Sequence, residues 1–387
     1  MNNRIEPDEP TIVNPNTARL RKLYDHFRKR KLIWIIFFII LIVVTIIVAT
    51  ITATVNKTKK EKISTTEIAT TTTTPSPPST TTTTTSDTNT KWKQSASTVA
   101  GGNGRGRELN QLSNPWGIYV DNDDQSIYIA DVLNNRIVRW EFGSNNGEIV
   151  ADGNGPGNEI DELHSPSDVV LDKEKKYLII CDQSNTRVVR WARRNSLVQY
   201  ILIPYIACSG LAMDNNEDLY ISDWVKHEVR RFQQGDKEGK VVAGGNNYGD
   251  QLNQLNKPMY IFVDGDYSIY IADNKNNRVM KWMKNAIEGI LVAPGQVSNE
   301  NSSSMSGPIG VIVDHTGNIY VSNDNNHQIT RWSLGAIEGV PVVGEKEKGS
   351  GPTQLSHPFD LSFDQQGNLY VVDILNARIQ KFDIDHD

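Results

Sequence analysis

The residues with the clearest capacity for chemistry are acidic and basic side chains that recur at a fixed distance in the last three quarters of the chain. Each set has an Asp, an Asn three residues later and an Arg five residues later. The four sets are Asp131, Asn134 and Arg136; Asp182, Asn185 and Arg187; Asp273, Asn276 and Arg278; Asp373, Asn376 and Arg378. An Asp and an Arg at this spacing can hold a charged ligand or fasten their own turn through charge-assisted hydrogen bonds. Four copies favour the turn, because one asymmetric ligand needs only one site.

Four of the seven histidines form a second set, each in a different segment: His164, His227, His327 and His357. No two of them have the short spacing typical of metal ligands, so a metal site would require all four segments to converge. The chain also lacks a Gly-x-Ser-x-Gly motif, a phosphate-binding loop and a His-Glu-x-x-His motif. The sequence therefore assigns no catalytic residue, metal or cofactor. It favours a non-enzymatic protein and leaves an enzyme open.

Cys181 and Cys208 are the only two cysteines, which excludes a RING, B-box or other cysteine-rich zinc module. We expect both cysteines on one face, in neighbouring repeats. A disulfide requires their Cα atoms to lie within about 7 Å in an oxidising compartment. Two buried thiols are the other outcome that the sequence allows.

The elements that position these residues are six tandem repeats. The anchor of each repeat is a segment similar to Tyr-Ile-Ala-Asp, and successive anchors are 51, 41, 50, 50 and 50 residues apart. The anchors start at Tyr128, Ile179, Tyr220, Tyr270, Tyr320 and Tyr370. Short alternating runs before and after each anchor predict four antiparallel strands per repeat, which is the pattern of a β-propeller blade.

The sixth repeat ends at Phe382 and lacks a fourth strand, whereas residues 98–102 match that strand ahead of the first repeat. We therefore expect residues 98–102 to join the last blade and close the ring, which leaves no open edge. The sequence predicts an all-β, six-bladed propeller over residues 95–387.

The tandem repeats resemble the NHL repeat, and the resemblance covers about three quarters of the chain. The resemblance rests on Pro-x-Gly-Ile-x-Val-Asp at residues 115–121 and Ile-Tyr-Ile-Ala-Asp-x-x-Asn-Asn-Arg-Ile-x-Arg-Trp at residues 127–140. It implies a six-bladed β-propeller that acts as a binding platform, as in tripartite-motif proteins, sensor domains of bacterial membrane kinases and the peptidylglycine amidating lyase.

The resemblance leaves two alternatives to a binding module. The first is a propeller-type, metal-dependent lyase or hydrolase, although the histidine-bearing motifs of the amidating lyase are not recognisable here. The second is a ubiquitin-ligase-related or RNA-binding role, as in tripartite-motif relatives. Residues 95–387 have a net charge of -13, which repels phosphates, so we expect no nucleic-acid partner.

The candidate binding surface lies where the repeats differ, because propellers bind through the loops at their faces. The third repeat differs most: Lys226, His227 and Glu228 replace Asn, Asn and Arg, and a glycine-rich connector is missing. The loop before each first strand and the turn after each second strand share one face, since adjacent strands are antiparallel. That face predicts a binding surface for a protein or glycan made of Trp116, His164, Asp168, Trp224, His227, Met259, Tyr260, His327, His357, Phe359 and Asp360.

The N-terminal part of the chain has the composition of a membrane anchor. Residues 32–55 carry no charge, and 24 residues suffice to cross a bilayer, so they predict a transmembrane helix after a basic cytoplasmic tail of residues 1–31. Residues 56–94 then form a stalk, in which 19 of the 27 residues from 64 to 90 are Ser or Thr. We expect a type II signal-anchor protein with an extracellular or lumenal propeller and an N-glycosylation sequon at Asn301.

Overall fold

The computed structural model describes residues 90–152, 155–193, 199–295 and 305–386. The predicted tail, the predicted transmembrane helix, residues 56–89 of the stalk and Asn301 lie outside the described residues. Within these described ranges no helix has the length and hydropathy required to span a bilayer. The chain from Asp87 to Asp387 separates as one compact unit.

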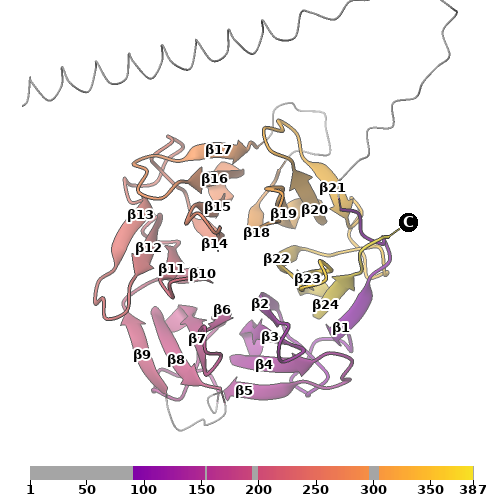
Figure 1. Cartoon of the computed structure of the whole chain (residues 1–387). Helices are drawn as coiled ribbons and strands as arrows, with labels where there is room; N and C mark the ends of the chain where they lie inside the picture. The colour runs from indigo at the N-terminus through magenta and orange to yellow at the C-terminus, as the bar shows by residue number, and fades with distance from the viewer. Residues whose placement is uncertain (1–89, 153–154, 194–198, 296–304, 387) are drawn as a thin grey trace, which may run out of the picture. The chain divides into compact units, whose positions relative to one another are not determined.

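Six four-stranded sheets are arranged around a ring, which confirms the predicted six-bladed propeller (Figure 1). The strands of each sheet are antiparallel and pair in chain order in blades 1 to 5. Figure 1 shows the first strand of every blade nearest the centre of the ring and the fourth strand at its rim.

Blades 1 to 3 come from the first half of the propeller. Blade 1 consists of β2 (Pro115–Asp121), β3 (Ser126–Asp131), β4 (Arg136–Glu141) and β5 (Glu148–Asp152). Blade 2 consists of β6 (Pro166–Leu171), β7 (Tyr177–Asp182), β8 (Arg187–Ala192) and β9 (Gln199–Pro204). Blade 3 consists of β10 (Cys208–Met213), β11 (Leu219–Asp223), β12 (Glu228–Phe232) and β13 (Lys240–Gly244).

Blades 4 to 6 complete the ring. Blade 4 consists of β14 (Pro258–Val263), β15 (Ile269–Asp273), β16 (Arg278–Trp282) and β17 (Ile290–Ala293). Blade 5 consists of β18 (Pro308–Val313), β19 (Ile319–Asn323), β20 (Gln328–Trp332) and β21 (Val340–Val343). Blade 6 consists of β22 (Pro358–Phe363), β23 (Leu369–Asp373), β24 (Arg378–Phe382) and β1 (Ser97–Gly101).

The ring closes as the sequence predicts. Strand β1 pairs antiparallel with β24, so the N-terminal strand completes the last blade. Ahead of β1, Trp92 forms a bridge with Ile384, and the N–H of Lys93 donates to the carbonyl of Asp383 at 2.9 Å. Both ends of the propeller are thereby fastened to each other, and no unpaired edge is left at the junction.

Apolar strands hold neighbouring blades together. The second strands are buried along their length, because β-branched and aromatic residues there pack between two adjacent sheets. Each third strand adds one large buried aromatic side chain between blades. These side chains are Trp140, Trp191, Phe232, Trp282, Trp332 and Phe382.

The turn after the second strand is a short 3-10 helix in five blades. These turns are η1 (Val132–Asn134), η2 (Gln183–Asn185), η3 (Asn274–Asn276), η4 (Asp324–Asn326) and η5 (Ile374–Asn376). The residue after each of them adopts the left-handed conformation, with φ between 49° and 58°. We call the segments that lead into the first strands connectors, and the face that carries the connectors and these turns the connector face.

Candidate functional site

The recurring Asp and Arg pairs fasten the connectors as well as the turns. In blade 1 the Nε of Arg136 donates to Asp131 Oδ2 at 2.8 Å, and its two terminal nitrogens donate to the carbonyls of Arg107, Glu108 and Gln111 at 2.8–3.2 Å. The carbonyl groups all belong to the connector, residues 102–114. One guanidinium therefore holds residues 107–111 of the connector against its blade.

Asn134 and Asp131 complete this clamp. The amide of Asn134 donates to the carbonyl of Gly106 and to Asp131 Oδ2, both at 2.8 Å. Asp131 Oδ1 accepts the N–H of Ser113 at 2.7 Å. Burial raises the pKa of Asp131, and the hydrogen bonds from Asn134, Ser113 and Arg136 oppose that rise.

The clamp recurs in blades 2, 4 and 6 with nearly identical geometry. The hydrogen bonds of their arginines to the clamp Asp and to three connector carbonyls measure 2.6–3.0 Å. Their arginines are Arg187, Arg278 and Arg378. In these four blades the acid–base chemistry found in the sequence is used inside the protein.

Blade 3 lacks both the connector and the clamp. Only residues 205–207 join β9 to β10, whereas thirteen residues, 245–257, join β13 to β14. Glu228 stands where the other clamps have Arg, and its carboxylate accepts from Arg230 Nε at 2.6 Å. Asp223 is fully buried, and its Oδ2 has no hydrogen-bond partner within the described chain. Asp223 Oδ2 thus lacks the two hydrogen bonds that Asp131 Oδ2 accepts from Asn134 and Arg136 in blade 1.

A groove with a volume of about 270 Å³ lies beside this position, between blades 2 and 3. Its walls come from the end of β9 and the segment after it, and from the turn, third strand and following loop of blade 3. The lining residues are Ile203, Pro204, Tyr205, Ile206, Lys226, Arg230, Phe232, Lys237 and Glu238. The sequence showed that the connector was missing but did not identify this groove.

The propeller axis is closed by side chains from the first strands. The rings of Trp116 and Phe359 lie 5.0 Å apart, and the rings of Tyr260 and Phe359 lie 5.9 Å apart. Met259 packs against the same cluster. Of these predicted surface residues, Tyr260 and Phe359 are buried, while Trp116 and Met259 are partly buried.

Asp168 and Asp360 are also buried at the axis, where each bridges to the next blade. Asp168 Oδ2 accepts the N–H of Leu211 at 2.7 Å, and Asp360 Oδ2 accepts the N–H of Ile118 at 2.9 Å. Burial raises the pKa of Asp360 to about 7, and burial together with the charge of Asp360 raises the pKa of Asp168. Both carboxylates therefore tie blades together from inside the ring.

Glycine makes room for one of these bridges. Gly117 of blade 1 faces Asp168, and a Cβ at Gly117 would lie 2.5 Å from Asp168 Oδ1. A side chain at this position would therefore collide with the carboxylate that links blades 2 and 3. Packing against Asp168 therefore requires glycine at position 117.

Two predicted histidines act as hydrogen-bond acceptors between blades. In blade 1, Asn135 Oδ1 accepts the N–H of Ser165 at 2.9 Å. At the same position His227 Nδ1 accepts the N–H of Lys257 at 3.0 Å, and His327 Nδ1 accepts the N–H of His357 at 3.3 Å.

The other predicted surface residues lie on the connector face. The rings of His327 and His357 are 4.7 Å apart, and His357 Nδ1 lies 3.0 Å from Asp324 Oδ1. His164 is exposed. Trp224 is partly buried, and the Lys257 ammonium lies 5.2 Å from its ring centre. Five of the predicted residues thus remain open to solvent at least in part on this face: His164, Trp224, His227, His327 and His357.

A disulfide joins Cys181 of β7 to Cys208 of β10, with Cα atoms 5.7 Å apart. Both residues are fully buried. The bond fastens blade 2 to blade 3 at the junction where only residues 205–207 separate β9 from β10. Of the two states that the sequence left open, the structure contains the disulfide.

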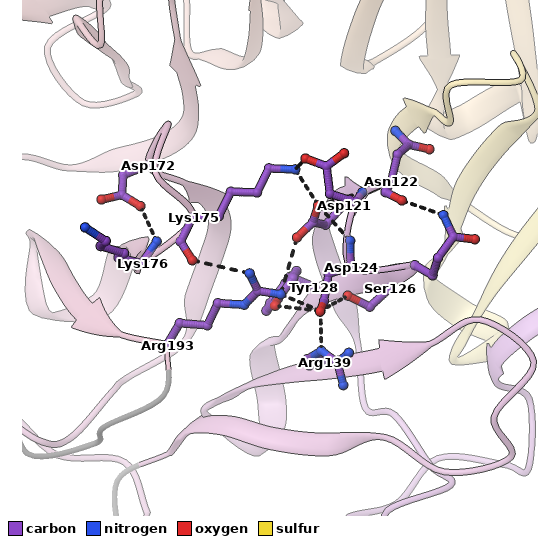
Figure 2. A network of polar contacts seen from close by, with 12 residues as sticks. Asp121, Asn122, Asp124, Ser126, Tyr128, Arg139, Asp172, Lys175, Lys176 and Arg193 are labelled. Atoms are coloured by element: carbon purple, nitrogen blue, oxygen red, sulfur yellow. Dashed lines mark hydrogen bonds and ion pairs between the residues drawn. The ribbon is translucent and has the colours of Figure 1, made fainter.

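The opposite face carries an ion-pair network between blades 1 and 2 (Figure 2). Lys175 Nζ donates to Asp121 Oδ1 at 2.6 Å, and Arg193 pairs with Asp124. Burial opposes ionisation of Asp124, but hydrogen bonds from Arg139 and Ser126 lower its pKa to about 2. Sequence reasoning missed this network because Lys175 and Arg193 lie about 50 to 70 residues after Asp121 and Asp124, in another blade.

Metal binding has no ready-made site in the ranges that the structure describes. No group of three or more His, Cys, Asp or Glu side chains there has the geometry of a metal site. The His327 and His357 pair has one neighbouring carboxylate, Asp324.

These features define the chain as a six-bladed β-propeller with clamped connectors. Residues 112–140, from the end of the first connector through β4, match the family model of the NHL repeat. Blade 1 therefore contains a segment that matches the NHL repeat. No curated protein sequence matches it significantly.

Solved structures share the fold at low sequence identity. A protein of unknown function from Bacteroides thetaiotaomicron is 17% identical, with a TM-score of 0.60 over 75% of this chain and 76% of that chain. An auxiliary nutrient binding protein from the same organism is 14% identical, with a TM-score of 0.59 over 77% and 78%. A gluconolactonase from Xanthomonas campestris is 12% identical, with a TM-score of 0.52 over 72% and 88%. Identities this low establish the common fold alone.

Proposed function

We propose that the chain is a single-pass membrane protein whose propeller binds a protein or a glycan outside the cytoplasm. The observation that carries this proposal is the contrast among the blades. Four blades use their Asp, Asn and Arg side chains to hold their own connectors, whereas blade 3 has lost its connector and presents a groove. Binding surfaces of propellers lie on such variable loops.

Three features support the membrane-anchored, extracellular arrangement. The uncharged segment 32–55 has the length of a transmembrane helix, and more basic residues precede it than follow it. The Ser- and Thr-rich segment that follows it in the sequence, residues 64–90, has the composition of a glycosylated stalk. The disulfide between Cys181 and Cys208 fits an oxidising compartment.

The binding role also agrees with the named functions of some proteins of this fold. The auxiliary nutrient binding protein described above is one, and a second protein with that description, from Bacteroides ovatus, has a TM-score of 0.55 at 13% identity. The competing proposal is a metal-dependent lyase or hydrolase, which the gluconolactonase of this fold favours.

One experiment separates the two proposals. The compact unit, residues 87–387, is secreted as a soluble domain and tested for binding to cell-surface proteins and glycans, with and without a chelator. We expect saturable binding that the chelator does not change. Stoichiometric metal in the domain, together with hydrolase or lyase turnover that the chelator abolishes, would overturn the binding proposal in favour of the enzyme.

The orientation in the membrane has its own test. Cells that express the full chain are treated with protease from outside, and the chain is examined for glycans at Asn301 and along the stalk. We expect external protease to remove the propeller and glycosidases to lower the apparent mass. A protected, unglycosylated propeller would contradict the extracellular arrangement.

A further inference from the structure

The groove between blades 2 and 3 occupies the place that a connector fills in other blades. In blade 1 the carbonyl of Leu109, a connector residue, accepts the N–H of Gly147 at 2.7 Å, and in blade 4 the carbonyl of Leu252 accepts the N–H of Gly289 at 2.8 Å. Both glycines directly precede the fourth strand of their blade. The corresponding residue of blade 3 is Gly239, whose N–H has no acceptor in the described part of the chain.

The walls of the groove are the same elements that enclose a connector elsewhere. In blade 4, Leu255 of the connector is fully buried in one cluster with Ala243 of β13 and Met280 of β16. These two strands are the fourth strand of the preceding blade and the third strand of blade 4. The groove likewise lies between β9, the fourth strand of blade 2, and β12, the third strand of blade 3. Its shape is therefore that of a slot for a peptide.

The charge of the slot differs from that of the other blades. Arg230 pairs with the same second-strand position as Met280, so a charged residue replaces a buried apolar one. Arg230 donates to Glu228 and to the carbonyl of Glu238. Lys226 and Lys237 also line the slot, and neither ammonium contacts a carboxylate in the described ranges. Two exposed ammonium groups without a carboxylate partner, on a domain with a net charge of -13, favour an acidic ligand.

We propose that this groove binds a short acidic peptide segment of a partner protein, which lies where the connector lies in the other blades. Phe232, Ile203 and Ile206 provide the apolar floor for one aliphatic side chain of the segment, and Lys226 and Lys237 bind its carboxylates. A peptide fits better than a glycan because the chain itself fills the equivalent slots with peptide. The proposal rests on the proposed binding function and names the chemistry of its partner.

The chain supplies its own probe for this groove. The connector of blade 2 contains Gly-Pro-Gly-Asn-Glu-Ile-Asp-Glu-Leu-His at residues 155–164, an acidic sequence with two aliphatic residues. A fluorescent peptide of this sequence is titrated with the full chain in detergent micelles, and its anisotropy is followed. A second peptide carries Gln and Asn in place of Glu and Asp. We expect saturable binding of the acidic peptide and binding weaker by about tenfold for the neutral one, as for the loss of exposed ion pairs.

Two variants of the full chain test the location. Lys226→Glu/Lys237→Glu should weaken binding of the acidic peptide by about tenfold or more. The matched variant Lys275→Glu/Lys284→Glu has the same charge change on blade 4 and should bind as the unchanged chain does. Insertion of residues 246–255 after Tyr205 restores a connector to blade 3 and should abolish binding.

Several outcomes would overturn the proposal: no saturable binding, equal loss in both lysine variants, or binding of a sulfated oligosaccharide but not of the peptide. Its failure can be told apart from failure of the proposed function. Loss of peptide binding in Lys226→Glu/Lys237→Glu, with no cell-surface partner for the domain, would support the groove and contradict the proposed function. If the domain has a cell-surface partner that both lysine variants bind equally, and no peptide binds, the groove proposal is contradicted and the proposed function is supported.

Discussion

Blades 1 and 3 have the same four-stranded sheet but different means of attachment to the ring. The second and third strands of both blades pair in the same register, with Asp131 opposite Arg136 and Asp223 opposite Glu228. Blade 1 adds a connector held by four side-chain hydrogen bonds from Arg136 and Asn134 and by one that Asp131 accepts from the N–H of Ser113. Blade 3 has neither. The comparison shows that strand pairing and packing between blades form the sheet, whereas the clamp serves to hold irregular chain.

The junction without a connector has other fastenings. The disulfide between Cys181 and Cys208 joins β7 to β10, and Asp168 of blade 2 accepts the N–H of Leu211 in blade 3. Both contacts lie among buried residues. Blade 3 is thus attached from inside, and its outer side is left open as the groove.

The largest effect is expected from Arg136→Ala in blade 1. This change removes four hydrogen bonds and leaves the buried carboxylate of Asp131 without its cation. The free energy of unfolding of residues 87–387 should fall by about 3–5 kcal/mol, measured by chemical denaturation. The control is Lys226→Ala, at the position in blade 3 that corresponds to Asn134. This change should alter the free energy of unfolding by less than about 0.5 kcal/mol. Similar effects of both changes would show that the clamp does not distinguish the blades.

The next effect is expected from the disulfide. The change Cys181→Ser/Cys208→Ser opens a bond between residues 27 positions apart and should lower the free energy of unfolding by about 3 kcal/mol. Thermal unfolding of residues 87–387 with and without reductant measures the same loss in the unchanged domain. The double variant should then be insensitive to reductant. A melting temperature that reductant does not alter in the unchanged domain would contradict the role of this bond.

The ring and its closure could be predicted because they depend on patterns repeated along the chain. Six anchors gave six blades, and the unmatched strand at residues 98–102 correctly predicted the pairing of β1 with β24. The Asp and Arg pairs could be assigned to the turn for the same reason. That Arg136 also holds the connector could not be predicted, since the carbonyls that it binds lie 25 to 29 residues earlier and carry no side-chain signal.

The candidate surface was harder to predict because exposure depends on three-dimensional placement. Asp168, Tyr260 and Asp360 belong to first strands near the connector face, yet they point into the axis and are buried. One signal was present in the sequence: the third residue of the first strand alternates between Gly117, Gly210 and Gly310 and these three larger residues. Such alternation indicates side chains that cross a crowded axis.

The smallest effect is expected from the histidines that replace Asn between blades. His327 Nδ1 accepts the N–H of His357, as Asn277 Oδ1 accepts the N–H of Gly307 in blade 4. Burial and the neighbouring His357 lower the pKa of His327 below its usual value of 6.5, while Asp324 opposes this and Lys348 adds to it. A protonated Nδ1 cannot accept a hydrogen bond.

The sign of the pH dependence follows from this lowered pKa. Between the pKa of His327 in the folded protein and 6.5, the unfolded chain binds more protons, so stability is complete above pH 6.5 and is lost as the pH falls through that window. The loss should be less than about 1 kcal/mol, the value of one hydrogen bond. His327→Asn keeps the acceptor without titrating, so denaturation of residues 87–387 at pH 7.5 and 5.5 should show a smaller pH effect in this variant. His164→Asn, at an exposed site, is the control; an equal pH effect in His327→Asn and the unchanged domain would exclude the hydrogen bond as its source.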